Sequence, residues 1–206
     1  MRYFITMRRH LLRGSIMTVY GKGEPESIIV QLAEKLPRGS MALDMGSGEG
    51  RNVLYLARQG IKVEAWDKDA REIRTLKALA AKENLEIHAE ACDMRDFRIG
   101  FNNRDAIINS FSLHYLKPED AIERLHHIRT SLKRGGYHAM LQFTENGDLA
   151  RTGHQRFFPK VDDALKAYAK WEIITKSVEM RSCAQRGPQG QELNNEVLVL
   201  LARKPL

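Results

Sequence analysis

The sequence has few cysteines and no long hydrophobic run. Its 206 residues include two cysteines, Cys92 and Cys183, far apart along the chain. This usage is typical of a reducing compartment, so we expect free thiols, no disulfide, no metal site and a cytoplasmic protein. No apolar stretch approaches the roughly 20 residues that span a bilayer, so we expect no membrane partner. The composition, 43% apolar and 29% charged, is typical of a globular domain.

Acidic residues are absent from the first 23 positions, which carry Arg2, Arg8, Arg9, Arg13 and Lys22. This arm supplies +5 of the net charge of +7, so the remainder is nearly balanced. A nucleic-acid-binding domain should be basic over its folded surface, so we do not expect nucleic acid as a partner. The arm also lacks the apolar segment and cleavage site of a targeting sequence. We expect a basic arm over 1–23 and one domain over 24–206, with the native start left open between Met1, Met7 and Met17.

Apolar periodicity divides the domain into alternating helices and strands. Helical spacing predicts helices over 26–36, 52–59, 70–82, 118–132 and 161–169. Short apolar or alternating runs predict strands over 41–44, 61–66, 85–91, 105–110, 137–143, 171–178 and 196–202. The last two strands, joined by a turn over 186–191, suit an antiparallel pair at a sheet edge. Repeated βα units predict an α/β fold, a three-layer, doubly wound, mostly parallel seven-stranded sheet with an antiparallel last strand.

A glycine-rich stretch follows the first predicted strand, which Asp44 closes. Gly46, Gly48 and Gly50 lead directly into the next helix. Glycine lets a backbone approach a ligand closely, and a helix N-terminus supplies N–H groups, so the stretch predicts a nucleotide-type cradle. Arg51 stands where a dinucleotide fingerprint has its third glycine, and there is no Gly-Lys-Ser/Thr of a phosphate loop.

Acidic residues close or follow the first three predicted strands. Asp44, Asp67 and Asp93 occupy these places, so a doubly wound topology brings them to one edge of the sheet, where ligands bind. Acids without a lysine or arginine clamp do not suit a pyrophosphate. They suit a cationic or neutral ligand that carries a ribose and an adenine.

These motifs resemble those of the class I S-adenosylmethionine-dependent methyltransferases. The glycine-rich first motif of that class matches 44–50, its ribose-binding acid matches Asp67, and its adenine-binding acid matches Asp93. Further matches are Asn109-Ser110-Phe111 after the fourth strand and Gly135-Gly136 before the fifth. Within the class, residues 50–57 and 65–69 are most similar to the TehB tellurite-resistance and thiopurine-methyltransferase-like group. The resemblance covers residues 24–204.

The resemblance implies an enzyme that binds S-adenosylmethionine, releases S-adenosylhomocysteine and uses no metal. The acceptor is expected to be a small molecule, such as an oxyanion, thiol or selenol, and the protein a monomer or weak homodimer. Cofactor binding is assigned to Asp44, Met45, Gly46, Ser47, Gly48, Arg51, Trp66, Asp67, Lys68, Asp93, Met94, Asn109 and Ser110. Asp67 is expected to hold the ribose and Asp93 the adenine, while N–H groups of 46–48 are expected to bind the methionine part.

Methyl transfer from a sulfonium needs a general base only when the acceptor must lose a proton. His114 and Tyr115, just past the fourth predicted strand, are the candidate catalytic residues. The alternative for His114 is that it packs on the cofactor or caps the next helix.

The acceptor is the least determined part of the function. Tellurite-resistance enzymes carry a His-Arg pair before the last strand, and the matching place here holds Ala184-Gln185. A basic, partly aromatic lid for an anionic or soft acceptor is one expectation for Arg151, His154, Arg156, Phe157, Arg181 and Arg186. The alternative is that these residues belong to ordinary surface loops. The alternatives are an RNA or protein methyltransferase, or a non-catalytic cofactor-binding sensor.

Overall fold

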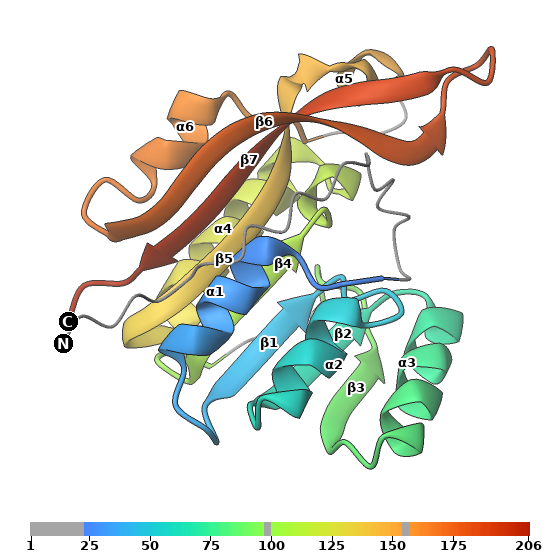
Figure 1. The fold of residues 1–206 in the computed structure, drawn as a ribbon. Coiled ribbons are helices and arrows are strands. Elements are labelled where there is room, and N and C mark those ends of the chain that lie inside the picture. Colours follow the sequence, from blue (N-terminus) through green and yellow to red (C-terminus); the bar gives the residue numbers. More distant parts are fainter. Residues whose placement is uncertain (1–22, 97–99, 154–156) are drawn as a thin grey trace, which may run out of the picture.

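The structure is a computed structural model that describes residues 23–96, 100–153 and 157–206 (Figure 1). Apart from Gly23, the predicted basic arm lies outside the described residues. In chain order the elements are α1 (Ser27–Lys35), β1 (Met41–Met45), α2 (Arg51–Arg58), β2 (Lys62–Asp67), α3 (Ala70–Lys82), β3 (Ile87–Ala91), β4 (Arg104–Ser110), the 3-10 helix η1 (Leu113–Tyr115), α4 (Pro118–Ser131), β5 (Leu132–Gly147), α5 (Asp148–Arg151), α6 (Val161–Lys166), β6 (Glu172–Arg186) and β7 (Glu192–Arg203).

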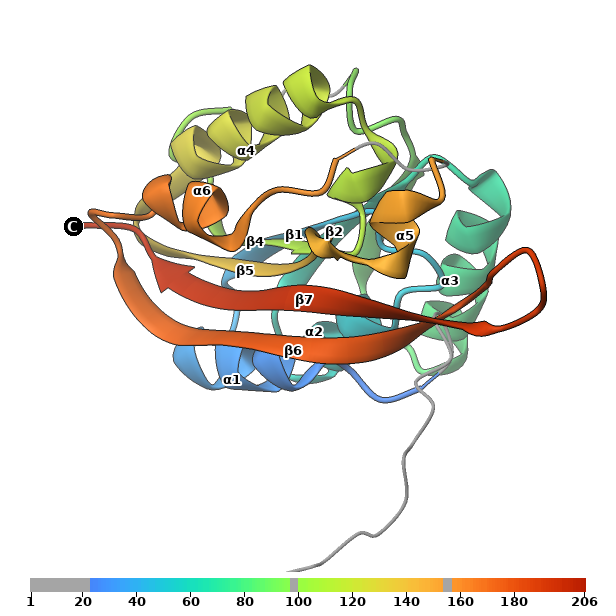
Figure 2. The ribbon, with the colours of Figure 1, turned by 90° about the horizontal axis from the view of Figure 1, so that it is seen from above.

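The strands form one sheet in the order β3-β2-β1-β4-β5-β7-β6. Strands β1 to β5 run parallel to their neighbours, whereas β7 is antiparallel to both β5 and β6. Seen from above, α1 and α2 cover one face and α4 and α6 the other (Figure 2). The predicted doubly wound, mostly parallel seven-stranded sheet with an antiparallel last strand is therefore confirmed.

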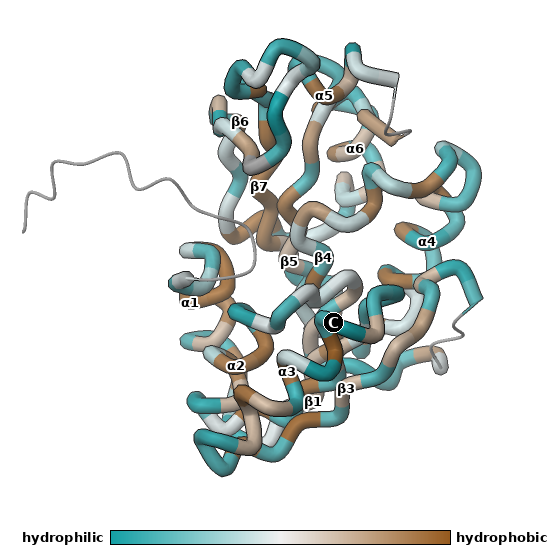
Figure 3. The backbone as a smooth tube through the Cα atoms, turned by 90° about the vertical axis from the view of Figure 1, so that its right-hand side faces the viewer, coloured by the Kyte–Doolittle hydropathy of each residue, from teal (hydrophilic) through white to brown (hydrophobic). Residues whose placement is uncertain are grey.

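The hydrophobic core has one layer on each face of the sheet. Successive side chains of a strand point to opposite faces, and the two layers share β4 in this way. Ile108 packs with the α1–α2 layer and Ile107 with the α4 layer, and both are fully buried. Positions with hydrophobic residues accordingly recur along the strands and the helices (Figure 3).

Local sequence signals set the helix starts beside the carboxyl edge of the sheet. The Asp69 carboxylate accepts a 2.8 Å hydrogen bond from the Arg71 amide and so caps α3. Pro118 opens α4, where its missing N–H is tolerated. Among the described residues, no helix is both long and apolar enough to cross a membrane.

The last three strands are longer than predicted. The strand predicted to end at residue 143 continues as β5 to Gly147, which pairs with Asn195 of β7. Strands β6 and β7 extend to Arg186 and Glu192, so their connection is a short hairpin. Gly135 and Gly136, expected to precede the fifth strand, instead lie at an irregularity inside β5. These differences arise from pairing between strands, which local periodicity does not report.

Candidate functional site

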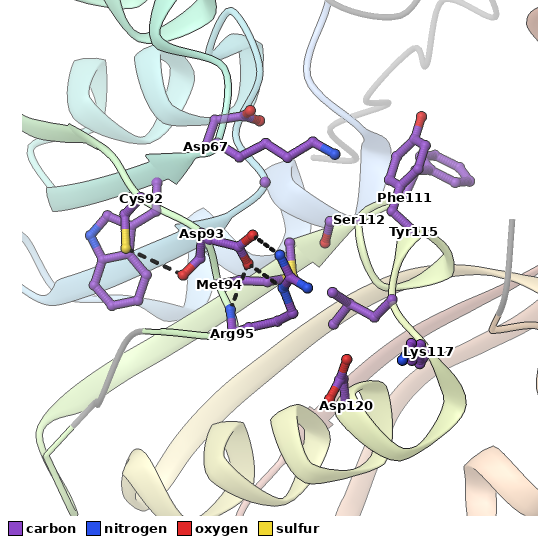
Figure 4. Close-up of a pocket in the computed structure, with 14 residues that line it drawn as sticks. Asp67, Cys92, Asp93, Met94, Arg95, Phe111, Ser112, Tyr115, Lys117 and Asp120 are labelled. Carbon is purple, nitrogen blue, oxygen red and sulfur yellow. Dashed lines mark hydrogen bonds and ion pairs between the residues drawn. The ribbon is translucent and has the colours of Figure 1, made fainter.

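A cavity of about 400 Å³ lies at the carboxyl ends of β1, β2, β3 and β4 (Figure 4). The strand order reverses between β1 and β4, and ligands of open α/β sheets bind at such a switch point. The volume is in the range of small-molecule sites. The residues that line it are Gly46, Trp66, Asp67, Lys68, Cys92, Asp93, Met94, Arg95, Phe111, Ser112, Tyr115, Leu116, Lys117 and Asp120.

The glycine-rich loop is shaped by close packing as much as by space for a ligand. A Cβ on Gly46, whose φ is +80°, would lie 2.4 Å from the Ser112 Cβ. A Cβ on Gly50, whose φ is +84°, would lie 2.2 Å from Leu76 of α3. Gly48 also has a positive φ, +53°, but a Cβ there would meet no described atom within 4 Å. Two of the three glycines are therefore required by neighbouring protein atoms.

The backbone amides of this loop already have acceptors. The N–H groups of Gly46 and Ser47 donate to the Trp66 carbonyl at 2.7 and 3.0 Å, and that of Gly48 donates to Asp67 Oδ2 at 2.9 Å. These bonds fasten the loop to the end of β2. The binding of the methionine part of a cofactor by the amides of 46–48 stays a prediction.

The Asp67 carboxylate is held at the cavity by two backbone donors. Oδ2 accepts from the Gly48 amide and Oδ1 from the Asp69 amide, both at 2.9 Å. A carboxylate offers about four acceptor positions in all, so both oxygens keep capacity for a ligand hydroxyl. This fixed orientation suits the recognition of a diol.

The Asp93 carboxylate is paired with Arg95 across the wall of the cavity. The guanidinium donates to Oδ1 at 3.0 Å and to Oδ2 at 2.6 Å, and the Arg95 amide adds a 2.9 Å bond. These bonds hold the pKa of Asp93 below its usual value. Beside it, the Cys92 thiol donates to the Asp93 carbonyl at 3.4 Å, and burial raises the pKa of that thiol (Figure 4).

Several buried polar atoms around the glycine loop lack partners among the described residues. They are both carboxylate oxygens of Asp44, the hydroxyls of Ser47 and Ser112, and Nη1 of Arg51. Burial raises the pKa of Asp44 to about 7, against the opposing influence of the Arg51 charge. Buried polar groups are normally hydrogen-bonded, so unsatisfied ones beside a cavity indicate a place for a polar ligand.

The two candidate catalytic residues occupy different environments. Tyr115 lines the cavity and its ring is partly exposed, with Lys68 Nζ 5.5 Å from the ring centre. His114 does not line the cavity and is 2% exposed, with ring neighbours Tyr115, Phe143 and Phe158. Burial lowers the pKa of His114 to about 4, so its imidazole is neutral at physiological pH.

The cavity brings together about half of the predicted site residues. Those that line it are Gly46, Trp66, Asp67, Lys68, Asp93, Met94 and Tyr115. Those that do not line it are Asp44, Met45, Ser47, Gly48, Arg51, Asn109, Ser110 and His114. Met45 is fully buried in the core, and Asn109 Oδ1 lies 2.6 Å from His138 Nε2. For the described residues, no cluster of three or more His, Cys, Asp or Glu side chains could hold a metal ion.

The sequence prediction missed other lining residues. They are Cys92, Arg95, Phe111, Ser112, Leu116, Lys117 and Asp120. Phe111 and Ser112 follow β4 as Asp93 follows β3, so their place after a parallel strand is the signal that could have identified them. Lys117 and Asp120 open α4, and nothing in their spacing pointed to the cavity.

The predicted basic lid is not a set of open cations. Arg151 pairs with Asp148, Arg181 with Glu26 and Glu179, and Arg186 with Glu192. Phe157 is buried in the core beside β5. His154 and Arg156 lie outside the described residues. None of the described members lines the cavity.

Comparison with known proteins gives one consistent family. The family model described as tellurite resistance protein TehB matches residues 21–201. A TehB of Haemophilus influenzae, described as a "probable S-adenosyl-L-methionine-dependent methyltransferase", is 26% identical over 172 residues, which cover 84% of this chain and 60% of that protein. The chain therefore spans about 60% of the length of the curated relative.

Solved structures agree on the fold. The crystal structure of TehB from Haemophilus influenzae superposes with a TM-score of 0.80 at 24% identity, covering 90% of this chain and 64% of that one. A Burkholderia thailandensis 1,6-didemethyltoxoflavin-N1-methyltransferase, solved with bound 1,6-didemethyltoxoflavin and S-adenosylhomocysteine, has a TM-score of 0.63 at 21% identity, with coverage of 88% of this chain and 78% of that one. At these identities, the likeness establishes a shared methyltransferase fold.

Proposed function

Because the chain belongs to the TehB tellurite-resistance family of class I S-adenosylmethionine-dependent methyltransferases, we propose that it transfers the methyl group of S-adenosylmethionine to a small-molecule acceptor. The acceptor we propose is a soft nucleophile: a thiol, a selenol or a reduced oxyanion of tellurium or selenium. The observation that carries the proposal is the set of unsatisfied buried polar atoms beside a cavity that already presents Asp67 and Asp93.

The residues present fit this cofactor part by part. The fixed carboxylate of Asp67 suits the two ribose hydroxyls, because charge-assisted hydrogen bonds to a diol are strong. Asp93 and Met94 suit the edge and face of the adenine. Asp44, both of whose oxygens lack a partner in the described part of the chain, suits the ammonium of the amino-acid part. Arg51 Nη1, likewise buried, suits its carboxylate.

The bound cofactor would supply a methyl group that its sulfonium already activates. The protein therefore mainly has to position an acceptor and exclude water, and correct positioning alone is worth up to about 7–11 kcal/mol of a barrier. Desolvation and the nearby Asp67 carboxylate raise the pKa of the Tyr115 hydroxyl, so this group is protonated at neutral pH. Tyr115 would then donate a hydrogen bond to an anionic acceptor rather than remove a proton from it.

An acceptor screen tests the proposal. Purified protein is incubated with S-adenosylmethionine labelled in its methyl group and with separate panels of thiols, selenols, selenite, tellurite, RNA and protein. We expect label in a volatile or organic-soluble small product, and none with Asp67→Ala. Label in RNA or protein would show that the acceptor is a macromolecule and would overturn the proposed small-molecule acceptor. Label in no panel, although the cofactor binds, would support a non-catalytic binding protein instead.

A further inference from the structure

The Glu26 carboxylate lies between two guanidinium groups that are far apart in the sequence. Oε1 accepts from Arg51 Nη2 at the start of α2, and Oε2 accepts from Arg181 Nη1 of β6 at 2.8 Å. The side chains of Glu26 and Arg51 are 8% and 9% exposed. A buried ion pair of this kind fixes geometry, because an alternative arrangement would leave a buried charge without a partner.

Glu26 reaches this position from the residue that precedes α1. It is the N-cap of that helix, yet its side chain makes no capping bond within the described residues and turns to the two arginines instead. Its own amide donates to Asn52 Oδ1 at 3.2 Å, which ties the start of α1 to the start of α2. The backbone on both sides of the pair is therefore fixed.

Arg51 is bonded through one nitrogen only. Nη2 is bound to Glu26, whereas the buried Nη1 has no acceptor in the part of the chain that the structure describes. The Asp44 carboxylate is near enough for its pKa to respond to the Arg51 charge, and both of its oxygens also lack partners there. Without Glu26, Nη2 of Arg51 would also lose its acceptor, and a pairing between Arg51 and Asp44 would satisfy both groups.

We propose that Glu26 is a positioning residue for the cofactor: it holds Arg51 by Nη2 and so keeps Arg51 Nη1 and the Asp44 carboxylate available for the carboxylate and ammonium of the amino-acid part. This inference rests on the proposed function. In the protein without a ligand, Glu26 prevents Arg51 and Asp44 from pairing with each other.

Arg181 bonds to a second glutamate, Glu179, which provides a matched control for Glu26. It shares Glu26 with Arg51 and also donates to Glu179 through Nε at 3.1 Å, so two arginines face two glutamates. Glu179 contacts Arg181 as Glu26 does, but in the described part of the chain it forms no hydrogen bond or ion pair with Arg51, and its side chain is 42% exposed. Glu179→Gln therefore removes the same chemical group from the same cluster without releasing Arg51.

The test compares two ligands that differ only at the amino-acid part. S-adenosylhomocysteine carries this part, and 5′-methylthioadenosine lacks it, so the ratio of their affinities reports the Asp44–Arg51 site alone. Both dissociation constants are measured by titration calorimetry for the full chain and for Glu26→Gln and Glu179→Gln. We expect Glu26→Gln to weaken the binding of S-adenosylhomocysteine about tenfold, which corresponds to about 1.4 kcal/mol of binding free energy. The dissociation constant of 5′-methylthioadenosine should stay within about twofold. Glu179→Gln should leave the ratio unchanged.

The single variant leaves two guanidinium groups around one neutral side chain and can fail to fold. In that case the double variant Glu26→Gln, Arg181→Gln removes the charges in balance, and the same fall in the affinity ratio is expected. An unchanged ratio in the variant that folds would overturn the inference and leave Glu26 a structural residue. A raised ratio would overturn it too, because Glu26 would then be competing with the ligand for Arg51.

The unaltered protein separates failure of the inference from failure of the proposed function. If it binds neither ligand, the proposed function itself fails. If it binds both equally, the Asp44–Arg51 site fails while the nucleoside site stands.

Discussion

The carboxyl edge of β1 to β4 and the β6–β7 hairpin satisfy their polar groups in different ways. At the edge, buried oxygens and nitrogens of Asp44, Ser47, Arg51 and Ser112 have no partner among the described residues. In the hairpin, Arg181 and Arg186 are each paired with glutamates. Because unsatisfied buried groups are costly, the first region supports the proposed ligand site, whereas these arginines of the second region already have their partners within the protein.

The largest effect on the free energy of unfolding is expected at Gly46, for which Gly48 in the same loop is the control. Gly46→Ala should destabilise the protein by about 4 kcal/mol, because its Cβ would collide with Ser112 at a positive φ. Gly48→Ala has the same kind of backbone but an open site, so it should cost only about 1 kcal/mol. Chemical denaturation measures both. Equal losses for the two variants would show that Gly46 is not in close contact with the residue-112 segment.

Asp44 should make the stability of the unliganded protein depend on pH. Its pKa is about 7 in the folded chain and near 3.8 when unfolded, so wild-type stability falls as the pH rises through this interval. The full loss is at most about 4 kcal/mol, at about 1.4 kcal/mol per pKa unit. Asp44→Asn escapes this loss but keeps a buried amide that costs about 1–3 kcal/mol. The variant should therefore gain about 2 kcal/mol at about pH 8 and lose about as much at about pH 4. A difference that does not vary with pH would mean that Asp44 is solvated or paired.

His114 tests whether the edge contains a general base. Its ring is buried among aromatic rings and its Nδ1 has no partner in the described ranges, so His114→Phe should change stability by about 1 kcal/mol or less. We expect methyl transfer and its pH profile to be retained. A general base would contribute about 100-fold or more, so a loss of that size with normal cofactor binding would restore His114 as the catalytic residue.

The smallest effect is expected in the hairpin. Arg186 and Glu192 form a pair at 3.0 Å with both side chains about half exposed, and such surface pairs are worth about 0–1 kcal/mol. Arg186→Gln should leave S-adenosylhomocysteine affinity within about twofold and should change only the affinity for an anionic acceptor, if any. A large loss of cofactor binding would bring the hairpin into the cofactor site and remove the contrast between the two regions.

The same contrast separates what the sequence could predict from what it could not. Asp67 and Asp93 follow consecutive parallel strands, so topology alone places them at one edge, and the structure finds both at the cavity. The ion-pair cluster around Glu26 could not be anticipated, because Glu26 is 25 positions from Arg51 and 155 positions from Arg181, and only the folded chain brings the three residues together. Strand periodicity likewise could not reveal that Gly147 pairs with Asn195, nor that His114 is buried beside the Phe143 ring.

The most direct test of the central claim is a calorimetric titration of the full chain with S-adenosylhomocysteine, compared with Asp67→Ala. The account predicts saturable binding at one site per chain, weakened by about 100-fold in the variant, since a charged acceptor with two ligand hydrogen bonds is worth about 3 kcal/mol. Arg186→Gln, measured alongside, should bind as the unaltered protein does. Failure of the unaltered protein to bind, or equal binding by Asp67→Ala, would contradict the assignment of this cavity to the methyl donor.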